Sequence, residues 1–223
     1  MKPRLSNQRN HALTLVEVLV VIVVLAVLVA MLLPALAIAQ KKALFISCNG
    51  NLKEIGLSFK IWEGDHTNLY PMSISTNFGG TLEYVPTSEV FRHFQVMSNE
   101  LSTPKILICP ADVRHAAKDF GSAFSNTNIS YFIGVDAVEP EPPRYLSAQM
   151  FLSGDDNFAI NGVSVKSELL EVSTNMTVTW TAARHKFIGN IGLADGSVQQ
   201  ITTTNLQQAI QATGIATNRL AIP

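Results

Sequence analysis

The sequence predicts an α+β protein in which a long N-terminal helix packs on a small domain with an antiparallel sheet. Three observations lead to this prediction. An apolar run fills residues 18–33, apolar residues recur at helical spacing over 44–62, and the remaining chain breaks into short strand-like segments. We therefore expect the first half of the helix to cross a membrane and the second half to support the domain.

The composition limits the classes of protein that this chain can be. It has 223 residues and a net charge of −1, which allows one domain with an appendage and gives no basic surface for nucleic acid. The two cysteines are too few for a disulfide-rich scaffold, and neither has a zinc-type spacing to another cysteine or a histidine. The sequence has no P-loop, dinucleotide, HExxH or GxSxG motif, so we expect no enzyme activity and no resident cofactor.

The apolar run follows a basic N-terminus. Sixteen consecutive apolar residues extend from Val18 to Leu33, close to the ~20 that a membrane-spanning helix needs. Lys2, Arg4 and Arg9 precede them and favour a cytoplasmic N-terminus. The run exceeds the roughly 7–15 apolar residues of a signal peptide. We favour a membrane anchor, while the alanines of residues 35–39 leave cleavage as a signal peptide as the alternative.

One carboxylate, Glu17, lies at the start of the apolar run. A carboxylate costs on the order of 2.5–3.5 kcal/mol at the centre of a bilayer and less near its edge. In one interpretation Glu17 lies at the level of the lipid headgroups and costs little. In the other, it is present to meet a positive charge.

The segment Ala12-Leu13-Thr14-Leu15-Val16-Glu17 resembles the type IV prepilin processing motif, in which a small residue precedes a hydrophobic-Thr-Leu-hydrophobic-Glu sequence. The resemblance implies that prepilin peptidase cuts between Ala12 and Leu13 on the cytoplasmic side and N-methylates Leu13. Glu17 and Pro34 stand at the family's distances from this cut. The sequence departs from the motif at Ala12, where the family usually has glycine.

This resemblance assigns roles to the N-terminal residues. Residues 1–12 would be a cleaved cytoplasmic leader, and residues 13–40 a transmembrane and assembly helix. Glu17 would neutralise the new α-amine of a neighbouring subunit in a filament, and Pro34 would belong to the same assembly helix. An unpaired buried carboxylate is costly, so this pairing would fix the register between subunits.

The helix is expected to continue from Leu13 to about Glu63. Pro34 predicts a kink or a short unwound stretch, and residues 41–64 form an amphipathic helix that continues into the domain. Its apolar stripe has spacings of three and four residues, which is typical of a buried helix face: Leu44, Cys48, Leu52, Ile55, Phe59 and Trp62.

Residues 65–223 are predicted to form an α+β globular domain. We expect a loop at 65–71, a short helix at 89–99, a proline-rich loop at 136–150 and a closing helix at 205–213. The strand candidates are residues 105–109, 129–135, 150–152, 158–165, 176–181, 187–193 and 197–202.

The two cysteines are candidates for a disulfide. Cys48 lies on the buried stripe, and Cys109 ends a strand that would pack against that stripe. Outside the cytoplasm the pair can oxidise, which would tie the helix to the domain. We expect this bridge, and the alternative is two buried free thiols.

Near the C-terminus, His185 is followed by nine residues and then by Asp195-Gly196. This pattern resembles the H-x9-DG signature of a pilin-like family, and segments at Cys48 and Cys109 resemble the same proteins. Asp-Gly supplies the positive φ of a tight hairpin turn, and His185 is expected to cap that turn. The alternative is a metal-binding or catalytic pair formed by His185 and Asp195.

A weak calcium candidate is the oxygen-rich segment of residues 154–157. Asp155 and Asp156 supply carboxylates there, as calcium prefers, but the segment lacks the spacing of an EF-hand. A solvated turn is the preferred interpretation.

These observations favour a structural subunit of a type II secretion pseudopilus. Its expected partners are copies of itself in a filament, prepilin peptidase, minor pseudopilins, an inner-membrane assembly platform and, before assembly, membrane lipid. We expect a single-pass inner-membrane protein with a cytoplasmic N-terminus and a periplasmic domain. The alternatives are a type IV pilin for adhesion or DNA uptake and, from another class, a membrane-anchored periplasmic enzyme or binding domain that uses His185 and Asp195.

Overall fold

The computed structural model describes residues 14–138 and 148–223. Residue contacts group the chain into two units, residues 1–43 and residues 44–223, and each unit is described by itself. The first unit holds the beginning of helix α1 (Leu15–Asp65). The second unit holds the rest of α1 and every other element of the described chain.

Helix α1 is continuous through Pro34. The alternative of a short unwound stretch at this proline is therefore wrong. A single proline removes one backbone hydrogen bond, and apolar helices tolerate this loss. The predicted helix, Leu13 to about Glu63, agrees with the observed bounds to within two residues, although Leu13 itself lies outside the described residues.

The first unit leaves its apolar surface uncovered. Side chains between Val18 and Leu33 are about half exposed or more, and none of the most apolar 18-residue window of α1 is buried. In the described part of the chain, α1 is the one helix whose length and composition suffice to cross a membrane.

In the second unit, the amphipathic stripe of α1 forms part of the core. Cys48, Leu52, Ile55, Phe59 and Trp62 are at most 2% exposed, which confirms the predicted inward face. Leu44 is 39% exposed, so its assignment to this face is wrong. The stripe therefore becomes buried one turn after the unit begins.

The main sheet has six strands in the order β5-β9-β1-β2-β7-β8, and every neighbouring pair is antiparallel. This confirms the predicted α+β class with an antiparallel sheet. The strands are β1 (Tyr131–Gly134), β2 (Phe151–Asp155), β5 (Glu168–Ser173), β7 (Ile188–Leu193), β8 (Val198–Thr202) and β9 (Thr217–Ile222).

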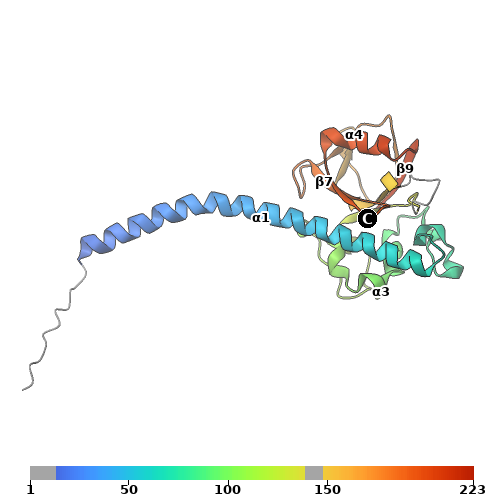
Figure 1. The fold of residues 1–223 in the computed structure, drawn as a ribbon, viewed down its shortest axis with the longest axis horizontal. Coiled ribbons are helices and arrows are strands. Elements are labelled where there is room, and N and C mark those ends of the chain that lie inside the picture. The colour runs from blue at the N-terminus through green and yellow to red at the C-terminus, as the bar shows by residue number, and fades with distance from the viewer. Residues whose placement is uncertain (1–13, 139–147) are drawn as a thin grey trace, which may run out of the picture. The chain divides into compact units, whose positions relative to one another are not determined.

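Both faces of this sheet are covered. Along β1, Tyr131 and Ile133 pack in the core that contains α1, whereas Phe132 packs in a second core with α4 (Thr203–Ala212). Figure 1 shows α4 on one side of the strands and the second half of α1 on the other. This two-sided burial explains why β1 is apolar throughout and does not alternate with polar residues.

A three-stranded sheet, β4-β3-β6, adjoins the second core. It contains β3 (Phe158–Ile160), β4 (Val163–Ser164) and β6 (Val178–Trp180). The prediction of one strand over residues 158–165 is wrong, because Asn161 and Gly162 both adopt positive φ and turn the chain into a hairpin. Asn-Gly is a strong hairpin signal that the sequence analysis did not use.

Short helices follow α1 in the chain and contribute buried side chains to the core that contains α1. These are the 3₁₀ turns η1 (Pro71–Ser73), η2 (Thr76–Phe78), η3 (Leu82–Tyr84), η4 (Pro104–Leu107) and η5 (Asn126–Asn128), and the α-helices α2 (Val90–Gln95) and α3 (Ser98–Leu101). The predicted helix at 89–99 is divided between α2 and α3. The predicted strand at 105–109 is wrong, since Pro104 starts a 3₁₀ turn in which the Lys105 N–H donates to Oγ1 of Thr103.

The end of the chain confirms one prediction and adds two strands. Helix α4 corresponds to the predicted closing helix, with Leu206 and Ile210 buried. Strands β5 and β9 pair over six residues and were not predicted. The predicted loop at 136–150 lies largely outside the described residues, since 139–147 are not described.

Two glycines give opposite expectations for stability. A methyl group at Gly134 would overlap the carbonyl oxygen of Phe151 on the neighbouring strand, so Gly134→Ala should lower the free energy of unfolding by about 1–3 kcal/mol. Gly50 lies in α1 with open space around the same position, so Gly50→Ala should raise it by about 1 kcal/mol. Urea unfolding of the full chain in detergent measures both values, and a shift of the two variants in the same direction would contradict this packing.

Candidate functional site

The chemistry-bearing residues gather in two places, one in each unit. The first is the start of α1, where Thr14 and Glu17 lie. The second is a buried group of polar side chains around the Cys48–Cys109 bridge in the domain.

Helix α1 begins with a reciprocal cap. The Thr14 N–H and hydroxyl donate to Oε2 of Glu17 at 2.7 and 2.9 Å, and the Glu17 N–H donates to Oγ1 of Thr14 at 3.2 Å. This is a capping box, which satisfies backbone donors that the first helical turn leaves free. A carboxylate at this end also interacts favourably with the helix dipole.

The predicted processing residues, Ala12 and Leu13, lie outside the described residues. Glu17 is described, and its carboxylate has a local partner that the sequence analysis did not foresee. The T-x-x-E spacing was the available signal for this cap. Pro34 lies within the uncovered part of α1.

In the domain, Cys48 of α1 and Cys109 form a disulfide, as predicted. Both residues are fully buried. The bond joins α1 to the segment after η4 and closes a loop between positions 61 residues apart. The described chain holds no free cysteine.

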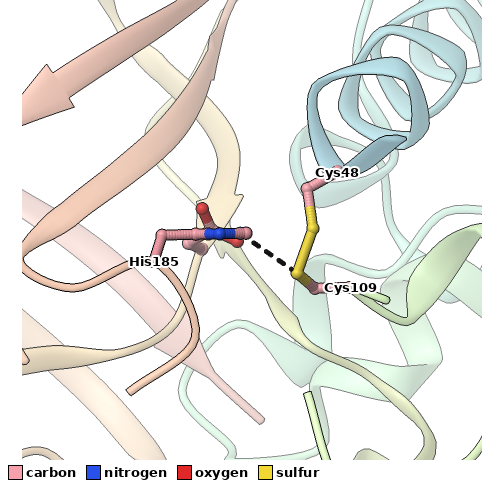
Figure 2. A group of neighbouring side chains, drawn as sticks. Cys48, Cys109 and His185 are labelled. Atoms are coloured by element: carbon pink, nitrogen blue, oxygen red, sulfur yellow. Dashed lines mark hydrogen bonds between the residues drawn. A yellow bond between two sulfur atoms is a disulfide. The ribbon is translucent and has the colours of Figure 1, made fainter. Parts of the chain in front are cut away.

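His185 lies against this disulfide. Its Nε2 is 3.2 Å from Sγ of Cys109, and its ring meets the ring of Phe45 edge to face. Figure 2 shows the imidazole pointing at the bridge. A disulfide sulfur carries no hydrogen, so Nε2–H is the donor and the imidazole is in the Nε2–H form. Burial, together with the nearby Arg184 charge, lowers the pKa of His185.

Next to His185, two arginines and two aspartates form an ion cluster, defined as Asp112, Arg114, Asp156 and Arg184. Nη2 of Arg114 lies 2.8 Å from Asp112 and 2.6 Å from Asp156. Nη2 of Arg184 lies 3.0 Å from Asp112 and also pairs with Asp156. The side chains of Arg184, Asp112 and Asp156 are each 7% exposed, so little water screens these pairs.

The cluster changes the acidity of its members. Burial alone would raise the pKa of Asp112, but the hydrogen bond from Arg114 and the charge of Arg184 hold that pKa at about 2. Asp155, beside the cluster, behaves differently, because it is completely buried. Burial raises the pKa of Asp155 to about 6, although the N–H of Asn190 and the Arg184 charge act against this rise.

The loop that carries Arg184 and His185 is held in an unfavourable backbone conformation. Arg184, Lys186 and Phe187 all adopt positive φ, between 52° and 65°. Each such residue costs of the order of 1–3 kcal/mol unless its surroundings fix it. Arg184 supplies that fixation through the cluster and through a 2.8 Å bond to the carbonyl of Ser130.

The Asp195-Gly196 turn lies elsewhere. Gly196 has a φ of 83°, and Oδ1 of Asp195 accepts from the Ser197 N–H at 2.8 Å, so the predicted tight turn is present. Gly196 packs near Gly56 of α1, which follows Cys48 by eight residues or about 12 Å of helix. His185 lies at the Cys48 bridge and therefore does not cap this turn. That part of the prediction is wrong.

Tyr70 anchors the same hairpin. Its hydroxyl donates to the carbonyl of Ala194 at 2.9 Å, and its side chain is buried. Tyr70 falls in the predicted loop at 65–71 and has no predicted role, because a contact across 124 residues leaves no local pattern. The same reason explains why Arg114 and Arg184 were not identified.

The geometry gives the weak calcium prediction no support. Calcium binds six to eight oxygen ligands. The carboxylate of Asp156 faces two guanidinium groups, and Oδ2 of Asp155 accepts two hydrogen bonds from Asn190. Calcium binding at these residues stays a prediction from composition alone.

One model of a known protein family matches the start of the chain. Residues 7–33 match the family model described as the prokaryotic N-terminal methylation motif. No curated protein and no solved structure matches the chain. The matched range contains Ala12, Leu13, Thr14 and Glu17 and extends to Leu33, the residue before Pro34.

The disulfide predicts a simple thiol result. The unfolded but unreduced protein should show no thiol that reacts with Ellman's reagent, and reduction should release two, because the chain has two cysteines. The Cys48→Ser, Cys109→Ser double variant should lose about 4 kcal/mol of unfolding free energy, the value that loop-closure entropy gives for this separation. Two reactive thiols before reduction would show that the bridge is not formed.

Arg184 should contribute strongly to stability. Arg184→Met leaves Asp112 and Asp156 with Arg114 as their remaining partner in the cluster, and it removes the ion pair of Asp155. Breaking a buried pair typically costs about 3–5 kcal/mol. Arg92→Met is the matched control, because that side chain is 39% exposed and its ion pair should contribute at most about 1 kcal/mol. Chemical denaturation at pH 7 compares the two, and equal losses would contradict a buried role for Arg184.

Proposed function

We propose that this chain, which carries a prokaryotic N-terminal methylation motif over residues 7–33, is a structural subunit of a pilin-like filament. Prepilin peptidase processes the subunit before assembly. The peptidase cuts between Ala12 and Leu13 and methylates the new α-amine. The mature subunit then starts with Leu13 and enters the filament through the apolar part of α1. The work of such a protein is mechanical, and it requires no active site.

The observation that carries this proposal is the combination of the motif with an uncovered apolar helix. Side chains from Val18 to Leu33 are about half exposed or more among the described residues. Exposed apolar surface of this extent must be covered by lipid or by other protein. Lipid covers it before assembly, and the helices of neighbouring copies replace the lipid afterwards.

Glu17 has two tasks in this account. Its Oε2 accepts both hydrogen bonds from Thr14, and these bonds survive cleavage because Thr14 remains inside the mature chain. A carboxylate can accept about four hydrogen bonds, so Oε1 stays free for the α-amine of a neighbouring subunit. The cap therefore orients the carboxylate, and the neighbour's charge compensates it within the apolar filament.

We propose the type II secretion pseudopilus as the filament, with minor pseudopilins and an inner-membrane assembly platform as partners. The Cys48–Cys109 bridge supports a domain outside the cytoplasm, since disulfides persist in oxidising compartments. A type IV pilus for adhesion or DNA uptake is the alternative. Deletion of the gene separates them: loss of protein secretion with surface pili intact supports the pseudopilus, and the reverse result supports the pilus.

A membrane-anchored enzyme using His185 and Asp195 is less well supported. The two side chains do not form a pair, because His185 contacts the disulfide and Asp195 caps its own turn. Arg184, the residue before His185, is engaged in ion pairs with Asp112 and Asp156. These contacts favour a structural role for both residues.

Two variants separate the tasks of Glu17. Glu17→Gln keeps an oxygen that accepts from Thr14, as in capping boxes with glutamine, but removes the charge. Thr14→Ala removes the cap, at a cost of about 1 kcal/mol, and keeps the charge. We expect both variants to insert in the membrane and to be processed, Glu17→Gln to form at least about tenfold fewer sheared filaments, and Thr14→Ala to assemble nearly as the parent does.

Cleavage of each variant is measured by its shift in electrophoretic mobility, so that an assembly defect is scored only for mature subunits. Normal assembly of Glu17→Gln would contradict the charge-pairing role. An equal loss of assembly in Thr14→Ala would show that the cap, and not the charge of Glu17, is what assembly requires.

A further inference from the structure

Four potential metal ligands converge at the disulfide. One ligand atom each from Cys48, Cys109, Asp155 and His185 lies within 4.8 Å of all the others. The two sulfurs are bonded to each other in this structure and cannot serve as thiolate ligands. After reduction, the same four residues would present two thiolates, one imidazole and one carboxylate around a common point.

Asp155 provides an independent reason to regard this group as a site. It is 0% exposed, and its Oδ1 has no hydrogen-bond partner among the described residues. Burying an unsatisfied carboxylate oxygen is costly, and such groups call for an explanation. Its nearest cation is Arg184, with Nη1 at 3.8 Å, which is too far for a hydrogen bond.

The surroundings hold Asp155 as metal ligands are usually held. The backbone N–H and the side-chain amide of Asn190 donate to Oδ2 at 2.8 and 3.2 Å, which fixes the carboxylate and leaves Oδ1 as the free oxygen. Ligand carboxylates in metal sites are typically hydrogen-bonded in this manner. His185 also fits, because its Nε2 already points at Sγ of Cys109 (Figure 2).

We propose that the reduced protein binds one zinc ion through Cys48, Cys109, His185 and Asp155. Zinc favours four tetrahedral ligands of these types, with ligand atoms about 3.3–3.8 Å apart given its usual bond lengths. Breaking the disulfide lets the two sulfurs separate to that range. Two thiolates and one carboxylate leave the zinc complex with one negative charge, and the Arg184 guanidinium lies 3.8 Å from the Asp155 carboxylate in the disulfide form.

The change between the two forms is a balanced redox reaction. A dithiol gives two electrons and two protons to the bridge, the S–S bond breaks, two Cys–SH groups form, and the dithiol closes to its own disulfide. Zinc then displaces the two thiol protons. The Nε2 proton of His185 moves to Nδ1, so that the Nε2 lone pair faces the metal. The disulfide and the zinc complex are thus alternative states of the same side chains, and this inference does not depend on filament assembly.

The test uses the full chain in detergent. The bridge is buried, so reduction is carried out in denaturant with a water-soluble phosphine. The phosphine delivers two electrons to the disulfide and takes up an oxygen atom from water to form its oxide. It is chosen because it adds no thiol that would compete for zinc. The chain is refolded without oxygen, with and without zinc sulfate, and freed of unbound metal by gel filtration. We expect one zinc ion per reduced chain, none in the oxidised chain, and a higher unfolding temperature on zinc addition in the reduced form alone.

Variants identify the ligands. His185→Gln and Asp155→Asn should each weaken zinc binding by more than about tenfold. Substituting a residue that only hydrogen-bonds to a metal ligand typically lowers metal affinity by about 10–100-fold, and losing a ligand itself should cost at least as much. His115→Gln is the control and should bind as the parent does, because His115 is exposed and its described bond uses the backbone carbonyl. Cobalt in place of zinc should give a thiolate-to-metal charge-transfer band, which the Cys48→Ser, Cys109→Ser double variant should lack.

Several results would overturn the proposal. A reduced, folded chain that retains no zinc would do so, as would equal zinc binding by the oxidised chain. Parent-like affinity in both His185→Gln and Asp155→Asn would show that other groups hold the metal. If the reduced chain fails to fold and zinc does not restore circular dichroism of the oxidised form, the site does not exist, since binding at a folded site must favour the folded state.

Discussion

The architecture depends on how two different surfaces of one helix are covered. Within the domain, the stripe from Cys48 to Trp62 is covered by the sheet and the short helices. Between Val18 and Leu33, the side chains of the helix are about half exposed or more among the described residues. An apolar surface must be removed from water, so the covering has to come from lipid or from other subunits. The Thr14–Glu17 cap starts the helix at the edge of this surface and places a carboxylate there.

The domain is stabilised at one point where covalent, ionic and packing interactions meet. The disulfide joins α1 to the segment after η4, and His185 packs on the disulfide. Arg184, the preceding residue, holds a strained loop against Asp112 and Asp156. The domain therefore anchors its loops on the same stretch of α1 that forms its core.

Much of this arrangement could be predicted from sequence, where local patterns carry the information. The apolar run, the stripe of α1, the Asp195-Gly196 turn and most strands of the sheet follow from periodicity and turn chemistry. Strand 158–165 was mistaken because the Asn161-Gly162 signal was not applied, and strand 105–109 because Pro104 was not weighed as a helix start. The ion cluster could not be foreseen, because its residues come from three distant segments and single arginines have no pattern. The tertiary fold likewise places His185 against the disulfide. The nine-residue spacing between His185 and Asp195 therefore did not predict its partner.

The central claim is that the apolar part of α1 is a temporary anchor that becomes an assembly surface after a cut at its cytoplasmic end. Intact-mass and terminal-peptide mass spectrometry of the protein purified from the native membrane tests this claim most directly. The account predicts a chain that begins with N-methylated Leu13. A chain that begins near Gln40, or one that retains Met1 when the peptidase is active, would contradict it.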